Sequence, residues 1–179
     1  NTLQKHDWQQ VKQTLIESAL AQPKTYVHRD YHSRNLMVTE QSNPGILDYQ
    51  DAVYGPLTYD AVSLLRDCYI AWPIEQVREW QRRYFLTLCE QKIMAKDEWQ
   101  TFLQAMDLMG IQRHLKAAGI FARLNLRDGK NGYLASIPNT CQYLLDVSAH
   151  DPHLVPFHQW LVMRFMPALE QFELGCSES

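Results

Sequence analysis

The order of apolar and polar positions divides the chain into a β-rich segment near its N-terminus and a long helical remainder. Apolar side chains recur at helical spacing from Trp8 to Ala19, which predicts a helix over residues 7–22 that ends before Pro23. Three short runs with β-branched or aromatic members follow, and they predict strands over residues 25–28, 35–38 and 45–47. The turn-forming sequence QSNPG (residues 41–45) between the last two runs predicts a β-hairpin.

Downstream of Pro56, nearly every segment has the apolar spacing of a helix. The helices predicted there cover residues 58–71, 74–92, 97–128 (with a break considered at Gly110), 133–149 and 155–173. Apolar residues from Trp99 to Met109 recur at helical spacing, which is typical of a buried core. The order of elements therefore predicts an α+β, predominantly helical fold, with a small β-hairpin unit and no linker that divides residues 1–179.

Composition narrows the classes of function. A formal net charge of −3 argues against a general nucleic-acid binder, which needs a basic surface, so no nucleic-acid partner is expected. No apolar run is long enough to span a membrane and no signal-peptide pattern is present, so no membrane partner is expected either. The four cysteines form no C-x-x-C pair, which argues against a disulfide framework or zinc site and fits a cytoplasmic location.

The predicted hairpin brings polar residues together. Asn35 stands at the start of its outgoing strand and Asp48 at the end of the returning strand, so we expect these side chains to lie side by side. An amide oxygen beside a carboxylate suits Mg²⁺, which prefers hard oxygen ligands. Asp30 lies on the loop that leads to the same place, where one carboxylate could face a substrate hydroxyl while the other two groups hold metal and phosphates. Such an arrangement suits phosphoryl transfer, in which positioning and charge neutralisation supply most of the catalysis.

The spacing His-x-Asp-x-x-x-x-Asn, from His28 to Asn35, resembles the catalytic loop of the kinase-like superfamily. The interval from Asp30 to Asp48 is similar to the distance in that family between the catalytic and the metal-binding aspartate. Where protein kinases have Asp-Phe-Gly, this chain has Asp48-Tyr-Gln, which resembles the aminoglycoside phosphotransferase and choline kinase branch, as does GPLTYDAVSLL (residues 55–65).

The resemblance is most specific to the bacterial anomeric N-acetylmuramate/N-acetylglucosamine kinases, and it runs from about Tyr26 to Tyr143. The segments that carry it are VHRDYHSRNLMV, GILDYQDAVYGPLTYDAVSLLRD and MGIQRHLKAAGIFARLNLRDGKNGYL. It implies the C-terminal lobe of a protein-kinase-like fold, ATP and Mg²⁺ as cofactors, and phosphorylation of the C1 hydroxyl of a cell-wall amino sugar during peptidoglycan recycling.

The resemblance also implies roles for individual residues. Asp30 is expected to accept the proton of the sugar hydroxyl, and Asn35 and Asp48 to bind the Mg²⁺ that bridges the ATP phosphates. His28 is expected to brace the catalytic loop, and Asp60 to tie the backbone of that loop to the helix below.

Three further residues are candidates for substrate contacts: His32 within the loop, Asp67 toward sugar hydroxyls, and Arg113 toward the lactyl carboxylate of N-acetylmuramate. Two of them have a simpler alternative, because Asp67 can pair with Arg66 and a solvated helix face also explains Arg113.

Simpler alternatives remain open for other residues as well. Asp30, Asn35 and Asp48 can cap turns around a solvated hairpin, and Asp60 is favourable in the first turn of any helix. Other open cases pair a functional with a structural interpretation: Arg34 (phosphate contact or solvation), Gln50 and Asp51 (metal support or capping), and Tyr54, Tyr69 and Trp72 (sugar platform or packing).

Kinase-like enzymes cover ATP with an N-terminal lobe that carries a Gly-rich loop and a strand lysine. Only 27 residues precede His28 here, and the seven glycines form no phosphate-covering loop. We therefore expect residues 1–179 to be a single C-terminal catalytic lobe, with the N-terminal lobe of the same protein as its partner and no activity by itself.

Two rival functions remain open. Another small-molecule kinase of the same branch, acting on an aminoglycoside, choline or homoserine, would use the same loop, although an aminoglycoside site should be lined with acidic groups. A non-catalytic kinase lobe that serves as a binding module is the alternative from a different class. The presence of Asp30, Asn35 and Asp48 together weighs against it, because a lobe without catalysis has no need of all three.

Overall fold

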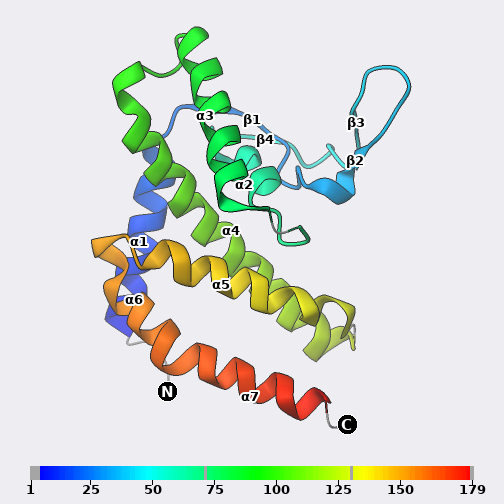
Figure 1. Cartoon of the computed structure of the whole chain (residues 1–179), viewed down its shortest axis with the longest axis vertical. Helices are drawn as coiled ribbons and strands as arrows, with labels where there is room; N and C mark the ends of the chain where they lie inside the picture. Colours follow the sequence, from blue (N-terminus) through cyan, green and yellow to red (C-terminus); the bar gives the residue numbers. More distant parts are fainter. Residues whose placement is uncertain (1–4, 71, 130, 178–179) are drawn as a thin grey trace. The chain divides into compact units, whose positions relative to one another are not determined.

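The computed structural model describes residues 5–70, 72–129 and 131–177. The chain folds into two compact units, one formed by residues 18–110 and the other by residues 1–17 and 111–179. The part of the chain that the structure describes is predominantly helical with a few short strands, which confirms the predicted α+β fold class (Figure 1).

The unit of residues 18–110 contains both pairs of strands. Its elements in chain order are the end of α1 (Lys5–Ala21), β1 (Lys24–Val27), a 3₁₀ turn η1 (Ser33–Asn35), β2 (Leu36–Met37), β3 (Gly45–Ile46), β4 (Val53–Pro56), α2 (Tyr59–Leu65), α3 (Ile74–Glu90), a 3₁₀ turn η2 (Lys96–Glu98) and the first part of α4 (Trp99–Asp128). The predicted hairpin is confirmed as β2 and β3, which pair antiparallel with Leu36 opposite Ile46. Figure 1 shows this hairpin and its loop extending away from α2 and α3.

Strand β4 (Val53–Pro56) was not among the strands predicted from the sequence. It pairs antiparallel with β1, with Lys24 opposite Pro56 and Val27 opposite Val53. A Gly and a Pro within four residues are unusual in a strand. Gly55 packs closely against β1, because a Cβ at this position would lie 3.3 Å from Cγ2 of Val27.

The predicted helix 58–71 is wrong at its C-terminal end, because α2 ends at Leu65. Arg66 already has a non-helical backbone (φ −122°, ψ 46°). The carboxylate of Asp67 then accepts the backbone N–H of Tyr69 at 2.9 Å, a local side-chain bond that competes with a further helical turn.

The core of this unit lies between α2, α3 and α4. Its buried members are Leu57, Val62, Phe85, Leu88, Phe102, Met106 and Met109. Trp99 and Leu103 pack against this cluster, so the apolar repeat from Trp99 to Met109 is confirmed as core. Complete burial of a side chain such as Phe102 (1% exposed) contributes about 1.5–3 kcal/mol. Helix α4 runs without interruption through Gly110.

The other unit is formed by helices. After α1 and α4, its elements are η3 (Asn131–Ser136), α5 (Ile137–Ser148), η4 (Pro152–Leu154), α6 (Val155–Trp160), a π-helical turn η5 (Leu161–Phe165) and α7 (Met166–Ser177). The single helix predicted over residues 155–173 is thus interrupted by one π-helical turn. Within the described ranges, the structure contains no helix that combines the length and the apolar character needed to cross a bilayer.

Candidate active site

The loop from His28 to Asn35 connects β1 to η1 and folds back on itself. The N–H of His32 donates to the carbonyl of Asp30, and the N–H of Asn35 donates to the carbonyl of His32, both at 3.0 Å. The side-chain amide of Asn35 also donates to the carbonyl of Asp30 at 2.9 Å. Asp30 and Asn35 are therefore held in one compact turn, and the side-chain oxygen of Asn35 is left as a potential ligand.

Asp60, in the first turn of α2, holds the N-terminal end of this loop. Its two carboxylate oxygens accept the N–H of His28 at 2.6 Å and the N–H of Arg29 at 3.1 Å. Arg29 has a left-handed backbone (φ 80°), which costs a non-glycine residue about 1–2 kcal/mol. The two bonds to Asp60 oppose that cost, because they form only when the backbone turns in this way.

The imidazole of His28 connects the loop to the hairpin. Its Nε2 lies 2.8 Å from the carbonyl oxygen of Leu47, so in this pair the ring nitrogen is the donor. The ring also packs edge-on against Tyr31, with centroids 5.8 Å apart. His28 thereby contacts the residue that immediately precedes Asp48.

Asn35 and Asp48 lie at the same end of the hairpin. The N–H of Leu47 donates to the carbonyl of Asn35 at 3.0 Å, which continues the β2–β3 pairing by one step. Asp48 follows with a left-handed backbone (φ 64°) and an exposed side chain. Its Oδ1 accepts the side-chain N–H of Gln50 at 2.6 Å, so Gln50 contacts the predicted metal ligand.

The donor set at this end of the hairpin fits Mg²⁺ better than a transition metal. Within the described residues, no three His, Cys, Asp or Glu side chains are grouped to hold a metal ion by themselves. An amide oxygen from Asn35 and one carboxylate from Asp48 leave most positions to water and phosphate oxygens, which is how Mg²⁺ is usually bound in phosphotransfer sites. The geometry does not test these roles, which stay predictions.

The residues predicted to contact substrate lie in different surroundings. Asp67 is buried (4% exposed), and its oxygens accept the N–H groups of Ser33 and Tyr69, both at 2.9 Å. His32 packs edge-on against the Tyr69 ring, with centroids 5.6 Å apart. Arg113 lies on α4 in the other compact unit, so its predicted contact stays a prediction.

Several contacts of this site carried no signal in the sequence. The guanidinium of Arg34 lies 3.6 Å from the centroid of the Tyr69 ring, although the two residues are far apart in the chain. The other two aromatic candidates lie elsewhere, Tyr54 against Tyr26 and Trp72 against Trp80. Local spacing contains no information on the Arg34–Tyr69 contact, because it depends on where the segment after α2 lies against the loop.

A pocket of about 380 Å³ lies between β1, α2 and α3, and Tyr31 of the catalytic loop forms part of its wall. Tyr26, Tyr31, Trp80 and Tyr84 line it together with Asp60. The hydroxyl of Tyr84 donates to the carbonyl of Leu57 at 3.2 Å. Burial, and secondly the nearby Asp60 carboxylate, raises the pKa of Tyr84, so its phenol remains a donor at neutral pH.

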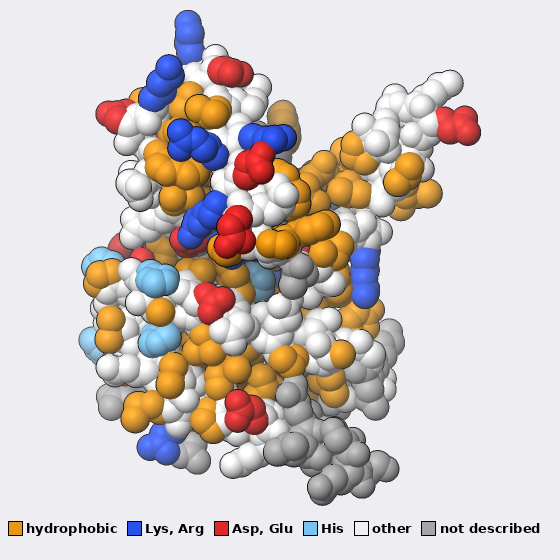
Figure 2. Space-filling view, in the orientation of Figure 1, with side chains coloured by type: hydrophobic (Ala, Val, Ile, Leu, Met, Phe, Trp, Pro, Cys, Tyr) orange, Lys and Arg blue, Asp and Glu red, His pale blue; other side chains and the backbone are white. Residues whose placement is uncertain are grey.

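The hairpin exposes apolar side chains. Val38 is 94% exposed, and Met37, Ile46, Leu47 and Tyr49 are also exposed. Hydrophobic side chains are visible along the projecting hairpin in Figure 2. A patch of this kind marks a surface that a ligand or another part of a protein covers.

Comparison with known proteins places these residues in context. A family model described as the phosphotransferase enzyme family matches residues 2–102, which include the loop, the hairpin and α2. A protein of Pseudomonas putida named N-acetylmuramate/N-acetylglucosamine kinase is 50% identical over 151 residues, which are 84% of this chain and 44% of that protein. Proteins of the same name from Neisseria meningitidis and Caulobacter vibrioides are 47% identical (89% of this chain, 47% of the relative) and 31% identical (90% and 43%).

These matches confirm the resemblance that the loop and hairpin motifs indicated. The chain spans less than half the length of each of these relatives.

Proposed function

Because the chain belongs to the phosphotransferase enzyme family, we propose that it is the catalytic part of an ATP- and Mg²⁺-dependent kinase. The acceptor we propose is the anomeric hydroxyl of a cell-wall amino sugar such as N-acetylmuramate or N-acetylglucosamine. The observation that carries this proposal is the 50% and 47% identity to two proteins named N-acetylmuramate/N-acetylglucosamine kinase, over more than four-fifths of this chain. The proposed location is the cytoplasm, where ATP is available.

The proposed mechanism assigns proton transfer to Asp30. Its carboxylate accepts the proton of the sugar hydroxyl as the oxygen attacks the terminal phosphorus of ATP, and ADP leaves. The compact turn between Asp30 and Asn35 supports this role, because a base must stay within hydrogen-bond reach of the proton that it removes.

Asn35 and Asp48 are proposed to hold Mg²⁺, which when bound neutralises charge on the ATP phosphates. Gln50 supports Asp48 by donating to its Oδ1. His28 supports the same end of the hairpin from the loop side, through the carbonyl of Leu47.

An N-terminal lobe of the same protein is the proposed partner that covers the nucleotide. The exposed apolar side chains of the hairpin support this proposal, since a covering lobe would remove them from water. The shorter length of this chain relative to the kinases that it matches is consistent with such a partner.

Phosphorus NMR tests the proposed reaction. The protein, produced from its whole reading frame, is incubated with Mg-ATP and, in separate tubes, N-acetylmuramate, N-acetylglucosamine, choline and kanamycin. We expect a sugar 1-phosphate signal in at least one of the two sugar tubes and none with the Asp30→Asn variant.

The other outcomes separate the rival functions. Product from choline or kanamycin alone would keep the phosphotransfer and overturn the amino-sugar acceptor. Mg-ATP binding without product in any tube would favour the non-catalytic binding module.

A further inference from the structure

The segment that follows α2 forms a hydrogen bond and ring contacts with residues 32–34, in the middle of the candidate catalytic loop. Oδ2 of Asp67 accepts the N–H of Ser33 at 2.9 Å, across 34 positions in the sequence. Oδ1 of the same carboxylate accepts the N–H of Tyr69, also at 2.9 Å. With 4% of its surface exposed, Asp67 satisfies these two amides inside the protein and offers little area to a sugar.

The ring of Tyr69 contacts the residues on either side of Ser33. The guanidinium of Arg34 lies over the ring face at 3.6 Å from the centroid, and the ring of His32 packs edge-on at 5.6 Å. Three consecutive loop residues, 32 to 34, are therefore in contact with residues 67 and 69.

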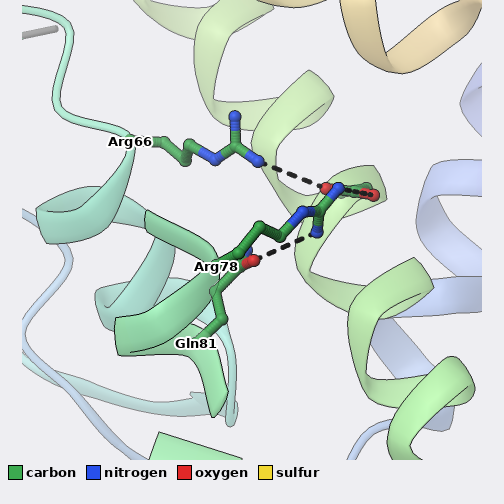
Figure 3. A network of polar contacts seen from close by, with 4 residues as sticks. Arg66, Arg78 and Gln81 are labelled. Carbon is green, nitrogen blue, oxygen red and sulfur yellow. Dashed lines mark hydrogen bonds and ion pairs between the residues drawn. The ribbon is translucent and has the colours of Figure 1, made fainter. Parts of the chain in front are cut away.

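The segment is itself anchored to α3 and α4. Arg66 forms an ion pair with Asp107 of α4 at 3.8 Å, and Arg78 of α3 lies 3.9 Å from the other oxygen of Asp107. Arg78 also donates to the side-chain oxygen of the buried Gln81 at 3.0 Å. Figure 3 shows Arg66 and Arg78 reaching the same carboxylate from two different elements.

We propose that Asp67 is a positioning residue for phosphoryl transfer, which fixes the catalytic loop after Asp30 in the chain as Asp60 fixes it before Asp30. This inference rests on the proposed function and concerns the same site. Asp60 holds the amides of His28 and Arg29, before Asp30 in the chain, and Asp67 holds the amide of Ser33 after it.

The physical reason is the sensitivity of transfer reactions to geometry. A loop bonded at one end only can swing, and a displacement of about 1 Å at the reacting atoms can cost 10²-fold in rate. Because Asp67 is bonded to the loop backbone, its loss should affect turnover more than substrate affinity. A substrate contact, which is the role expected from the sequence, should instead affect KM.

The first test is Asp67→Asn in the protein produced from its whole reading frame. A carboxamide can accept one of the two N–H groups, but it presents its own NH₂ to the other. We expect kcat for the sugar to fall at least tenfold and KM to change less than threefold. We also expect hydrogen exchange of the amides of residues 32–35 to become at least tenfold faster. Asp97→Asn, which changes an exposed carboxylate in η2, is the matched control and should alter none of these values.

A second variant removes the same bond from the other side. Ser33→Pro deletes the donating N–H and leaves α2 unchanged, and the extended backbone of His32 (φ −126°, ψ 170°) is suited to a residue before proline. Compared with Ser33→Ala, Ser33→Pro should lower kcat at least tenfold, as expected for Asp67→Asn. Adding Asp67→Asn to Ser33→Pro should lower kcat by less than a further threefold, because both changes remove the same hydrogen bond between residues 33 and 67. If Asp67→Asn does not fold, the comparison of Ser33→Pro with Ser33→Ala still decides.

Two results would overturn the proposal. One is a KM for the sugar at least tenfold higher with kcat unchanged, which identifies a substrate contact. The other is unchanged exchange of the amides of residues 32, 34 and 35 in both variants, whatever the activity. Because exchange is measured without substrate, faster exchange in a protein inactive on both sugars would support the loop contact and refute only the proposed amino-sugar acceptor.

Discussion

The catalytic loop and the hairpin that follows it are neighbours in the chain, yet they are held in different ways. The loop, residues 28–35, donates three backbone N–H groups to carboxylates of Asp60 and Asp67, which belong to α2 and the segment after it. The hairpin, residues 36–47, is held by its own short strand pairing and by a local bond from the N–H of Thr39 to the side chain of Asn43 at 3.1 Å. Its Val38 side chain is 94% exposed.

This difference in how the loop and the hairpin are held bears on two parts of the proposed reaction, turnover at Asp30 and binding beside Asp48. Residues 18–110 contain the acceptors that fix the loop of Asp30. The hairpin beside Asp48 exposes apolar side chains to solvent. We therefore expect changes in the loop to act on turnover and on stability, and changes in the hairpin to act on binding and association.

The largest effect is expected from Asp30→Asn in the whole protein. Turnover should fall by about 10²–10⁴-fold, the usual contribution of a general base, while Mg-ATP affinity changes less than threefold. Steady-state kinetics and calorimetric titration measure the two quantities, and Glu40→Gln, in the exposed hairpin loop, is the control. Turnover near that of the wild type would refute the assignment of Asp30 as base.

Asp60→Ala tests how firmly α2 holds the loop. The change leaves the amides of His28 and Arg29 without their acceptor, and we expect a loss of about 2–4 kcal/mol in the free energy of unfolding, measured with denaturant. Glu75→Ala is the matched control, since Glu75 lies in the first turn of α3 as Asp60 does in α2. It should cost about 0.3–1 kcal/mol, the size of a helix-dipole interaction. Equal losses in both variants would show that the loop contacts add nothing.

Asp48→Ala tests whether the residue at the end of the hairpin contributes to Mg-ATP binding. Loss of a proposed Mg²⁺ ligand should weaken Mg-ATP binding at least about 10-fold, because loss of a residue that only supports a metal ligand already costs about 10–100-fold. The free energy of unfolding should stay nearly unchanged, since the side chain is exposed. Glu40→Ala removes an exposed carboxylate in the hairpin loop and should change affinity less than threefold. An affinity that falls equally in both variants would indicate a general effect of charge.

The smallest effect on stability is expected from Val38→Lys. An exposed side chain usually changes the free energy of unfolding by no more than about 0.5 kcal/mol. Self-association of residues 1–179 should decrease, because the apolar surface of the hairpin is interrupted by a charge. Light scattering over a range of concentrations measures it, with Leu126→Lys (Leu126 is 86% exposed, on α4) as the control. A clean monomer of the unmodified chain at high concentration would contradict the expectation.

Local patterns in the sequence were sufficient for the helical class of the segments after Pro56, the hairpin and the family, but not for every helix boundary. The repeat from Trp99 to Met109 predicted a buried stripe, because helical spacing places these residues on one face. The turn chemistry between residues 41 and 45 predicted the pairing that places Asn35 and Asp48 at one end of the hairpin. The spacing from His28 to Asn35 indicated the kinase-like superfamily, and Asp48-Tyr-Gln with residues 55–65 indicated its phosphotransferase branch.

Tertiary structure alone decided how the loop is held. Strand β4 pairs with β1 where Gly55 approaches Val27 closely, and beyond the end of α2 at Leu65 the carboxylate of Asp67 accepts the amide of Tyr69. From the sequence, Asp67 was a candidate for sugar binding, whereas in the folded chain it accepts the N–H of Ser33. The physical reason is distance along the chain: a pair 34 positions apart leaves no periodic signal, and only the packing of α2 beneath the loop brings the carboxylate to the amide.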